Sequence, residues 1–262
     1  FDRPEALGLR SAGVPVLDPD GKTLRRFLVA RKWDVDAALK LYLGFVEFRL
    51  DFPDLEVQDA DIPASLKQRK LHLLPHPARD GTPVWYLRVR RHIAKDINHE
   101  SEHFTAFTFD RMTHHMGHVE QEQITFVADL SGASVRNFSI ESLVPALKMA
   151  LLYQPERLRA VVIWNAPSVF WAVWRGVICP FLDERTKSKF RFCYRLEEVV
   201  GSVFQSHAHV PDDLGGGLVE ERAVQLEHVP RLLSKQRSAP ASLGVTGGEG
   251  APQRCSPPAG GL

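Results

Sequence analysis

The sequence predicts an α/β fold, in which a helical N-terminal subdomain precedes a mainly parallel sheet with flanking helices. Three short segments rich in β-branched and aromatic residues alternate with segments of helical periodicity, which is the pattern of βαβ units. The segment before them has helical periodicity only. With 262 residues, of which 44% are hydrophobic and 25% charged, the chain can bury a full core without disulfides or metals.

The N-terminal segment from Thr23 to Arg49 predicts two helices that are broken near Trp33 and Asp34. Asp34 stands where the second helix needs an N-cap. Apolar residues recur along this helix at helical spacing and predict one buried stripe. They are Val35, Ala38, Leu39, Tyr42 and Val46.

Three buried strands are predicted at Val84–Val89, Ile124–Leu130 and Val161–Trp164. Helical faces lie between them. The first face contains Phe109, Met112, Met116 and Val119, and the second contains Ile140, Leu143, Val144, Leu147 and Leu151. Since proline is tolerated in the first turn of a helix, we expect the second helix to begin near Ser142, which places Pro145 in that turn.

A further helix is expected over Leu196–Ser206, before Pro211 and a glycine turn. From about Ser234 onward Gly, Pro and Ser dominate and apolar periodicity ends, which is typical of disorder. The expected organisation is therefore a helical subdomain over residues 1–62, an α/β domain over 63–217, and a largely disordered extension over 218–262.

Composition excludes several classes of protein. Lys and Arg number 33 against 32 Asp and Glu, so no overall field attracts nucleic acid. No apolar run approaches the ~20 residues of a membrane span. The three cysteines form no C-x-x-C pair, which predicts no disulfide framework and a reducing, cytoplasmic setting.

Motifs for enzymatic or metal chemistry are missing. The sequence contains neither a G-x-G-x-x-G loop, a P-loop nor a G-x-S-x-G elbow, and Asp129 after the second strand is interpreted as a turn or cap residue. His114, His118 and Glu122 share helical spacing, but no H-E-x-x-H pattern or fourth ligand accompanies them. We therefore predict no enzyme, no cofactor and no metal.

The segment Val169–Leu182 is unusually apolar and aromatic, and Arg175 is its one charged residue. Two interpretations remain open. It is either a buried core helix or a helix that covers an apolar cavity and meets a membrane interface, where tryptophan is favoured. The basic run that follows, together with Arg31 and Lys32, offers cations for a phosphate.

Five segments in collinear order resemble the CRAL-TRIO lipid-binding domain, and more narrowly the phosphatidylinositol transfer proteins called Sec-fourteen-like. The resemblance covers roughly Thr23 to Gly217. Its segments are TLRRFLVARKWDVDAALKLY, DGTPVWYLRV, QPERLRAVVIWNAPSVFWAVW, CPFLDERTKSK and PDDLGG.

The resemblance implies a sheet that floors a hydrophobic lipid pocket and a mobile gate helix that closes it. It also implies a headgroup site for phosphatidylinositol. The matching headgroup positions are Arg31, Lys32, Glu156, Thr186 and Lys189, and the gate and membrane-contact positions are Phe170, Trp171, Trp174 and Phe181. One departure concerns members that also carry phosphatidylcholine: their small hydroxyl residues are replaced here by Ile124 and Phe126.

We thus expect a monomer that binds a phospholipid, in the first place phosphatidylinositol, and transfers or presents it between membranes. Its contact with the membrane surface is expected to be transient. One alternative is a carrier of another hydrophobic molecule, such as a tocopherol, retinoid or sterol-like ligand. Another is a scaffold that recruits a partner protein or small GTPase to membranes.

Overall fold

The structure is a computed structural model that describes residues 21–51, 62–97 and 100–225. Its centre is a six-stranded sheet in the order β5-β4-β3-β2-β1-β6. The strands from β2 to β5 pair in parallel, whereas β1 is antiparallel to β2 and to β6. The strands are β1 Leu71–Leu73, β2 Val84–Arg88, β3 Ile124–Asp129, β4 Leu158–Trp164, β5 Phe190–Cys193 and β6 Val224–Gln225. The predicted α/β class is confirmed.

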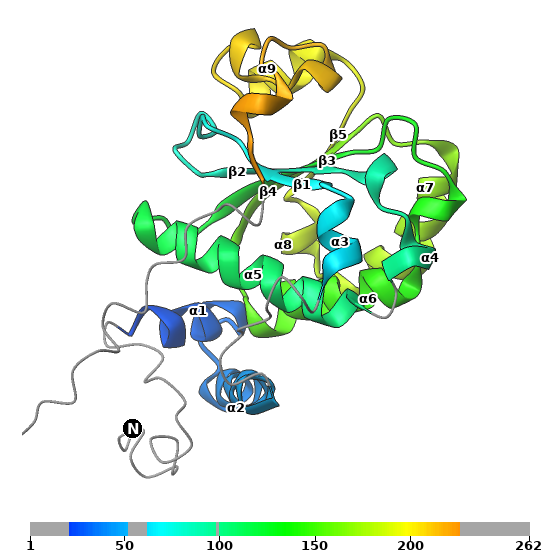
Figure 1. Ribbon diagram of the computed structural model, residues 1–262. Coiled ribbons are helices and arrows are strands. Elements are labelled where there is room, and N and C mark those ends of the chain that lie inside the picture. The colour runs from blue at the N-terminus through cyan, green and yellow to red at the C-terminus, as the bar shows by residue number, and fades with distance from the viewer. Residues whose placement is uncertain (1–20, 52–61, 98–99, 226–262) are drawn as a thin grey trace, which may run out of the picture. The chain divides into compact units, whose positions relative to one another are not determined.

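Helices cover both faces of the sheet. Figure 1 shows α9 on one face and α5 and α6 on the opposite face. The α-helices are α1 Lys22–Ala30, α2 Val35–Asp51, α3 Pro63–Lys67, α4 Ala94–Ile97, α5 Ser101–His118, α6 Ile140–Lys148, α7 Ser168–Val173, α8 Glu184–Lys187 and α9 Leu196–Ser202. Two π-helical turns, Met149–Tyr153 and Trp174–Ile178, continue α6 and α7.

Successive side chains along each strand point to opposite faces of the sheet, so the sheet separates two hydrophobic cores. Tyr86 in β2 and Val162 in β4 pack with Val199 of α9 on one face. Trp85, the neighbour of Tyr86, packs instead with Met112 of α5 on the other face. Since successive strand residues point to opposite faces, every buried strand here has apolar residues at nearly every position, as expected for a parallel sheet covered on both sides.

The two N-terminal helices have the predicted bounds, but the buried face of α2 agrees with the predicted stripe only in part. The backbone N–H of Ala37 donates to Asp34 Oδ1 at 3.0 Å, so Asp34 caps α2 as expected. The predicted stripe is wrong at two positions, because Val35 and Leu39 are 46% and 45% exposed. The buried positions of α2 include Ala38, Phe45, Val46 and Phe48.

Three further sequence predictions need correction. Helix α6 begins at Ile140 with Ser139 as its N-cap, so Pro145 lies inside the helix. Helix α9 ends at Ser202, four residues earlier than expected. The sheet continues beyond the expected boundary at Gly217, because β6 pairs with β1. Most of the extension expected to be disordered, residues 226–262, lies outside the described residues.

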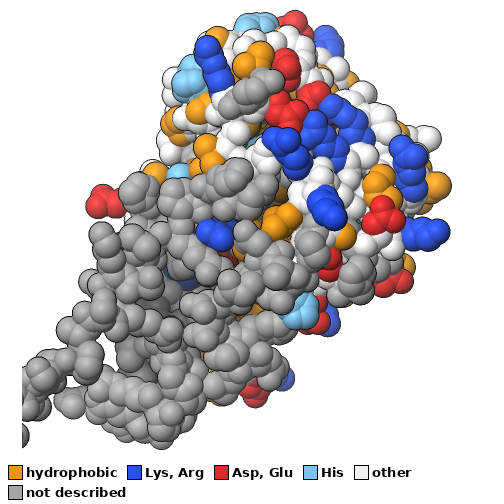
Figure 2. Space-filling model, viewed as in Figure 1, with side chains coloured by type: hydrophobic (Ala, Val, Ile, Leu, Met, Phe, Trp, Pro, Cys, Tyr) orange, Lys and Arg blue, Asp and Glu red, His pale blue; other side chains and the backbone are white. Residues whose placement is uncertain are grey.

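A partly buried network of charges links the segment after α9 to the sheet. Asp213 accepts hydrogen bonds from Arg88 and Arg90, and Asp129 Oδ2 accepts from Arg90 Nη1 at 3.0 Å. Glu220 accepts two hydrogen bonds from Arg91, at 2.7 and 2.8 Å. On the face viewed in Figure 2, basic and acidic side chains lie beside one another, so no field of one sign dominates that face.

Candidate functional site

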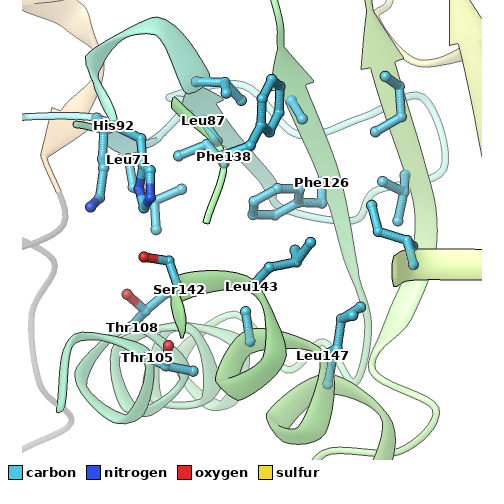
Figure 3. Close-up of a pocket in the computed structure, with 18 of the residues that line it drawn as sticks. Leu71, Leu87, His92, Thr105, Thr108, Phe126, Phe138, Ser142, Leu143 and Leu147 are labelled. Atoms are coloured by element: carbon cyan, nitrogen blue, oxygen red, sulfur yellow. The ribbon is translucent and has the colours of Figure 1, made fainter. Parts of the chain in front are cut away.

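The candidate site is an apolar cavity of about 320 Å³ between the sheet and helices α5, α6 and α7. The sheet contributes alternate residues of its strands, such as Leu71, Leu87, Phe126 and Ile163. The labelled side chains in Figure 3 point into the space between the strands and the helices. Because almost all of its lining is carbon, the cavity suits a hydrophobic molecule.

The helical wall of the cavity follows helical spacing. Helix α5 contributes Phe104, Thr108 and Met112, which lie one turn apart on one face. Helix α6 contributes Leu143 and Leu147 in the same way. The faces that the sequence predicted on these helices therefore line a cavity in part, rather than a fully packed core.

One part of the lining is polar. Its members come from the residue before β1, from the loops after β2 and β3, from the first half of α5 and from the start of α6. They are Lys70, His92, Ser101, Thr105, Thr108, Asn137, Ser139 and Ser142. The sequence did not predict any of them as site residues, because they are scattered along the chain and form no motif.

Burial changes the titration of the two basic groups in this lining. Lys70 is 2% exposed, and desolvation lowers the pKa of its amine to about 7 although Glu100 attracts the charged form. Desolvation and the nearby Lys70 lower the pKa of His92 to about 3, so His92 is neutral near pH 7. Neither group would therefore carry a full, solvated charge in the cavity.

The segment predicted as a gate helix consists of three short pieces: α7, the π turn, and a 3₁₀ turn at Cys179–Phe181. Phe170 is buried and lines the cavity. Trp171 and Trp174 pack against Phe192 and Phe190 of β5, with ring centroids 4.7 and 4.9 Å apart.

Phe181 differs from these three aromatic residues because it is 52% exposed. The segment thus has an inner side against the cavity and β5 and one outward aromatic side chain. The aromatic residue that lines the cavity, Phe170, is therefore a different one from the residue exposed to solvent, Phe181.

Three of the five expected headgroup positions lie near one another. Glu156 Oε2 lies 3.1 Å from Arg185 Nη2 and 3.8 Å from Lys189 Nζ, and burial lowers the pKa of Lys189. Thr186 lies in α8 between the two cations, where its backbone N–H donates to Asp183 Oδ1 at 2.7 Å. Lys189 directly precedes Phe190, which lines the cavity.

The other two expected positions, Arg31 and Lys32, follow the last residue of α1. Arg31 Nη1 donates to the carbonyl of Ala30 at 3.2 Å. Within the described part of the chain, neither side chain has an ion pair or hydrogen bond with Glu156, Thr186 or Lys189. Among the described residues, direct contacts thus join Glu156 and Lys189 but do not link Arg31 or Lys32 to them.

The two residues that depart from the phosphatidylcholine-binding pattern, Ile124 and Phe126, both line the cavity. They add apolar surface where a hydroxyl would give a hydrogen bond. Asp129, on the same strand, is buried and accepts from the backbone N–H of Ser131 at 2.9 Å, which confirms its interpretation as a turn residue. It also binds Tyr86 and Arg90, which the sequence did not predict.

Comparison with known proteins identifies the family. The CRAL/TRIO domain matches residues 67–216, which is more than half of the chain. The chain belongs to the CRAL-TRIO family. CRAL-TRIO proteins are generally lipid-binding transfer proteins, and the cavity of this CRAL-TRIO chain is of the kind that such binding requires.

Curated relatives agree with this assignment. A CRAL-TRIO domain-containing protein of Schizosaccharomyces pombe is 30% identical over 67% of this chain and 41% of its own length. Protein real-time of Drosophila melanogaster is 25% identical over 84% of this chain and 36% of its own. The human alpha-tocopherol transfer protein-like protein is 28% identical over 65% of this chain and 51% of its own length. The chain thus spans about half or less of these relatives' lengths.

Among solved structures, the crystal structure of Sfh5, a Sec14-like protein, superposes with a TM-score of 0.58. The two chains share 18% identity, and the match covers 74% of this chain and 70% of the other. At this identity the likeness concerns the fold. Among the described residues, no helix is long and apolar enough to cross a membrane, and no group of three acidic, His or Cys residues could hold a metal ion.

Proposed function

We propose that this CRAL-TRIO protein binds one hydrophobic lipid in its cavity and carries it between membranes. The apolar cavity between the sheet and helices α5 to α7 carries the proposal. Moving a lipid through water costs about 0.8 kcal/mol for each exposed CH₂ group, so an apolar cavity removes most of the cost of transfer. The family's general activity and the tocopherol transfer-like relatives support the same conclusion.

Phosphatidylinositol is the ligand that we propose first. Lys189 would bind the headgroup phosphate and Glu156 would accept hydrogen bonds from the inositol hydroxyls. The 3.8 Å separation of their side chains and the position of Lys189 beside the cavity-lining Phe190 support this arrangement. In this proposal Arg31 and Lys32 would approach the headgroup only when ligand is bound.

A second candidate is a smaller hydrophobic ligand with one polar group, in the class of tocopherols, retinoids or sterol-like molecules. Two observations favour it. A cavity of about 320 Å³ lies at the lower end of the ~300–1,000 Å³ typical of pockets for small ligands. The polar lining around Lys70 and His92 also lies inside the cavity, where a small ligand's polar group would need a partner.

We infer further that the protein acts in a reducing compartment and meets membranes transiently. The free thiols of Cys179 and Cys193 support the first inference, and exposed Phe181 supports the second. Neither inference requires an enzymatic step.

Lipid extraction tests the proposal. The purified protein is expected to yield one co-purifying lipid by mass spectrometry and to move labelled lipid from donor to acceptor vesicles. A membrane scaffold would bind vesicles without extracting lipid. Vesicle binding without any extraction of phosphatidylinositol, tocopherol or fatty acid would therefore contradict the carrier function.

A further inference from the structure

The cavity contains an amine that is almost wholly removed from water. Lys70 is 2% exposed, lines the cavity, and places its Nζ 4.1 Å from the centroid of the Phe104 ring. Its Nζ donates one hydrogen bond, to Gln68 Oε1 at 3.1 Å. Since an ammonium group has three donors, two directions remain for other acceptors.

The carboxylate that attracts the charged form of Lys70, Glu100, already accepts hydrogen bonds from other groups. Glu100 accepts from the backbone N–H groups of Ala64 and Ser65, at 3.0 and 2.7 Å. Within the described residues, no carboxylate lies within 4.0 Å of Lys70 Nζ. A buried cation without a direct ion pair is costly, because desolvation is repaid only by close opposite charge and hydrogen bonds.

A second polar group in the same lining lacks a partner. Thr108 is 7% exposed, and its hydroxyl has no hydrogen-bond partner among the described residues. Thr108 lies one helical turn after Phe104 in α5, so it shares the face over which the Lys70 amine sits. A buried hydroxyl without a partner is unfavourable, and a ligand acceptor would remove this cost.

Charge and donor count define the group that fits. Lys70 offers N–H donors, Thr108 offers an O–H donor, and the neutral ring of His92 offers one N–H donor. The complementary group is small, accepts several hydrogen bonds and carries a negative charge. A terminal carboxylate has all three properties and leaves the apolar remainder of the cavity to one hydrocarbon chain.

We propose that the cavity takes a single-chain hydrophobic carboxylic acid whose carboxylate binds Lys70 Nζ, with Thr108 as a second donor. This proposal rests on the carrier function and specifies the second ligand class given above. The apolar chain would lie along Phe126, Leu143 and Leu147, which line the same cavity. Phe104 would cover one side of the ammonium group, which favours its charged form.

The test compares three ligands that share one hydrocarbon chain: oleic acid, methyl oleate and oleyl alcohol. Competition of each ligand with the uncharged fluorescent probe Nile red is measured for the wild-type protein and for the Lys70→Met and Thr108→Val variants. Lys67→Met, which removes an exposed lysine of α3, is the matched control. Circular dichroism checks that each variant is folded.

Wild-type protein is expected to bind oleic acid about tenfold or more tightly than methyl oleate, the scale of a hydrogen bond to a charged group. Lys70→Met should remove this preference by weakening the acid alone, Thr108→Val should reduce it, and Lys67→Met should keep it. Equal affinities for acid and ester in the wild type, or a preference that survives Lys70→Met, would overturn the proposal and leave the carrier function standing. Failure of all three ligands to bind would also overturn this proposal, whereas the carrier function is tested separately by the extraction of phosphatidylinositol and tocopherol from vesicles.

Discussion

The Glu156 carboxylate lies 3.8 Å from the Lys189 ammonium, at the start of a strand whose first residue lines the cavity. This pair is separated by 33 residues in the sequence. The structure joins them because the loop before β4 and the residue before β5 lie at the same edge of the parallel sheet. This position at the cavity edge supports the proposal that Lys189 binds an anionic headgroup.

Lys189→Ala should lower loading of phosphatidylinositol about tenfold or more, because a charged hydrogen bond to the phosphate is lost. Lys187→Ala is the matched control, since Lys187 pairs with Glu184 on the exposed side of α8. Loading from vesicles is measured by mass spectrometry of extracted lipid. Unchanged loading in a folded Lys189→Ala protein would refute the headgroup assignment.

Charges introduced into the aromatic segment should have opposite effects at two positions. Trp174→Asp should destabilise the protein strongly, because Trp174 packs on Phe190 and Phe192. Phe181→Asp should leave the melting temperature nearly unchanged and weaken vesicle binding, because the Phe181 side chain is exposed. Thermal unfolding and vesicle sedimentation measure the two effects. If Phe181→Asp binds vesicles as the wild type does, Phe181 makes no membrane contact.

Asp129→Asn should reduce the free energy of unfolding by about 3 kcal/mol, the scale for breaking a buried ion pair. The Asp129 carboxylate is buried and accepts from Tyr86, Arg90 and Ser131, whereas asparagine offers them one uncharged acceptor oxygen. Urea unfolding measures the change. Glu184→Gln, in the exposed pair with Lys187, serves as the control and should show no measurable effect. Equal stability of both variants would contradict the structural role of Asp129.

Stability without ligand should rise as the pH is raised from about 7 toward 10.5. The unfolded chain keeps the Lys70 proton up to about pH 10.5, whereas the folded protein releases it near pH 7. Between these values the unfolded state binds more protons, so the contribution of Lys70 is at most about 1.4 kcal/mol per pH unit. The pKa of His92, about 3, keeps that neighbour neutral in this window. Urea unfolding of Lys70→Met should lack this rise, and an identical pH profile would show that Lys70 is not buried as described.

Much of the fold could be predicted because its central strands are short, buried runs with their own composition. Strands β1, β5 and β6 were missed because they have three, four and two residues, too few for a periodic pattern. They form through pairing with neighbours that are distant in sequence. The start of α6 was misplaced for a local reason: Ser139 caps the helix, and Pro145 is tolerated within it.

The candidate site was predictable only where a motif marked it. The resemblance of the run before β5 predicts Lys189 as a headgroup residue, which stays a prediction, whereas no local pattern marks Lys70 or His92. The pairing of β1 with β2 brings their ends together, and the backbone N–H of Arg88 donates to the carbonyl of Lys70 at 2.8 Å. The value of Lys70 as a site residue comes from burial, which the sequence around it does not indicate.

Native mass spectrometry after incubation with lipid vesicles tests the central claim, that the cavity holds one hydrophobic ligand. Vesicles containing phosphatidylinositol, tocopherol and oleic acid offer each ligand class. Ala146→Phe fills the cavity from α6, and Lys148→Phe places the same side chain on the exposed side of that helix. We expect one bound lipid in the wild type and in Lys148→Phe, and little or none in Ala146→Phe. Wild-type protein that stays free of lipid, or equal uptake by Ala146→Phe, would contradict the account.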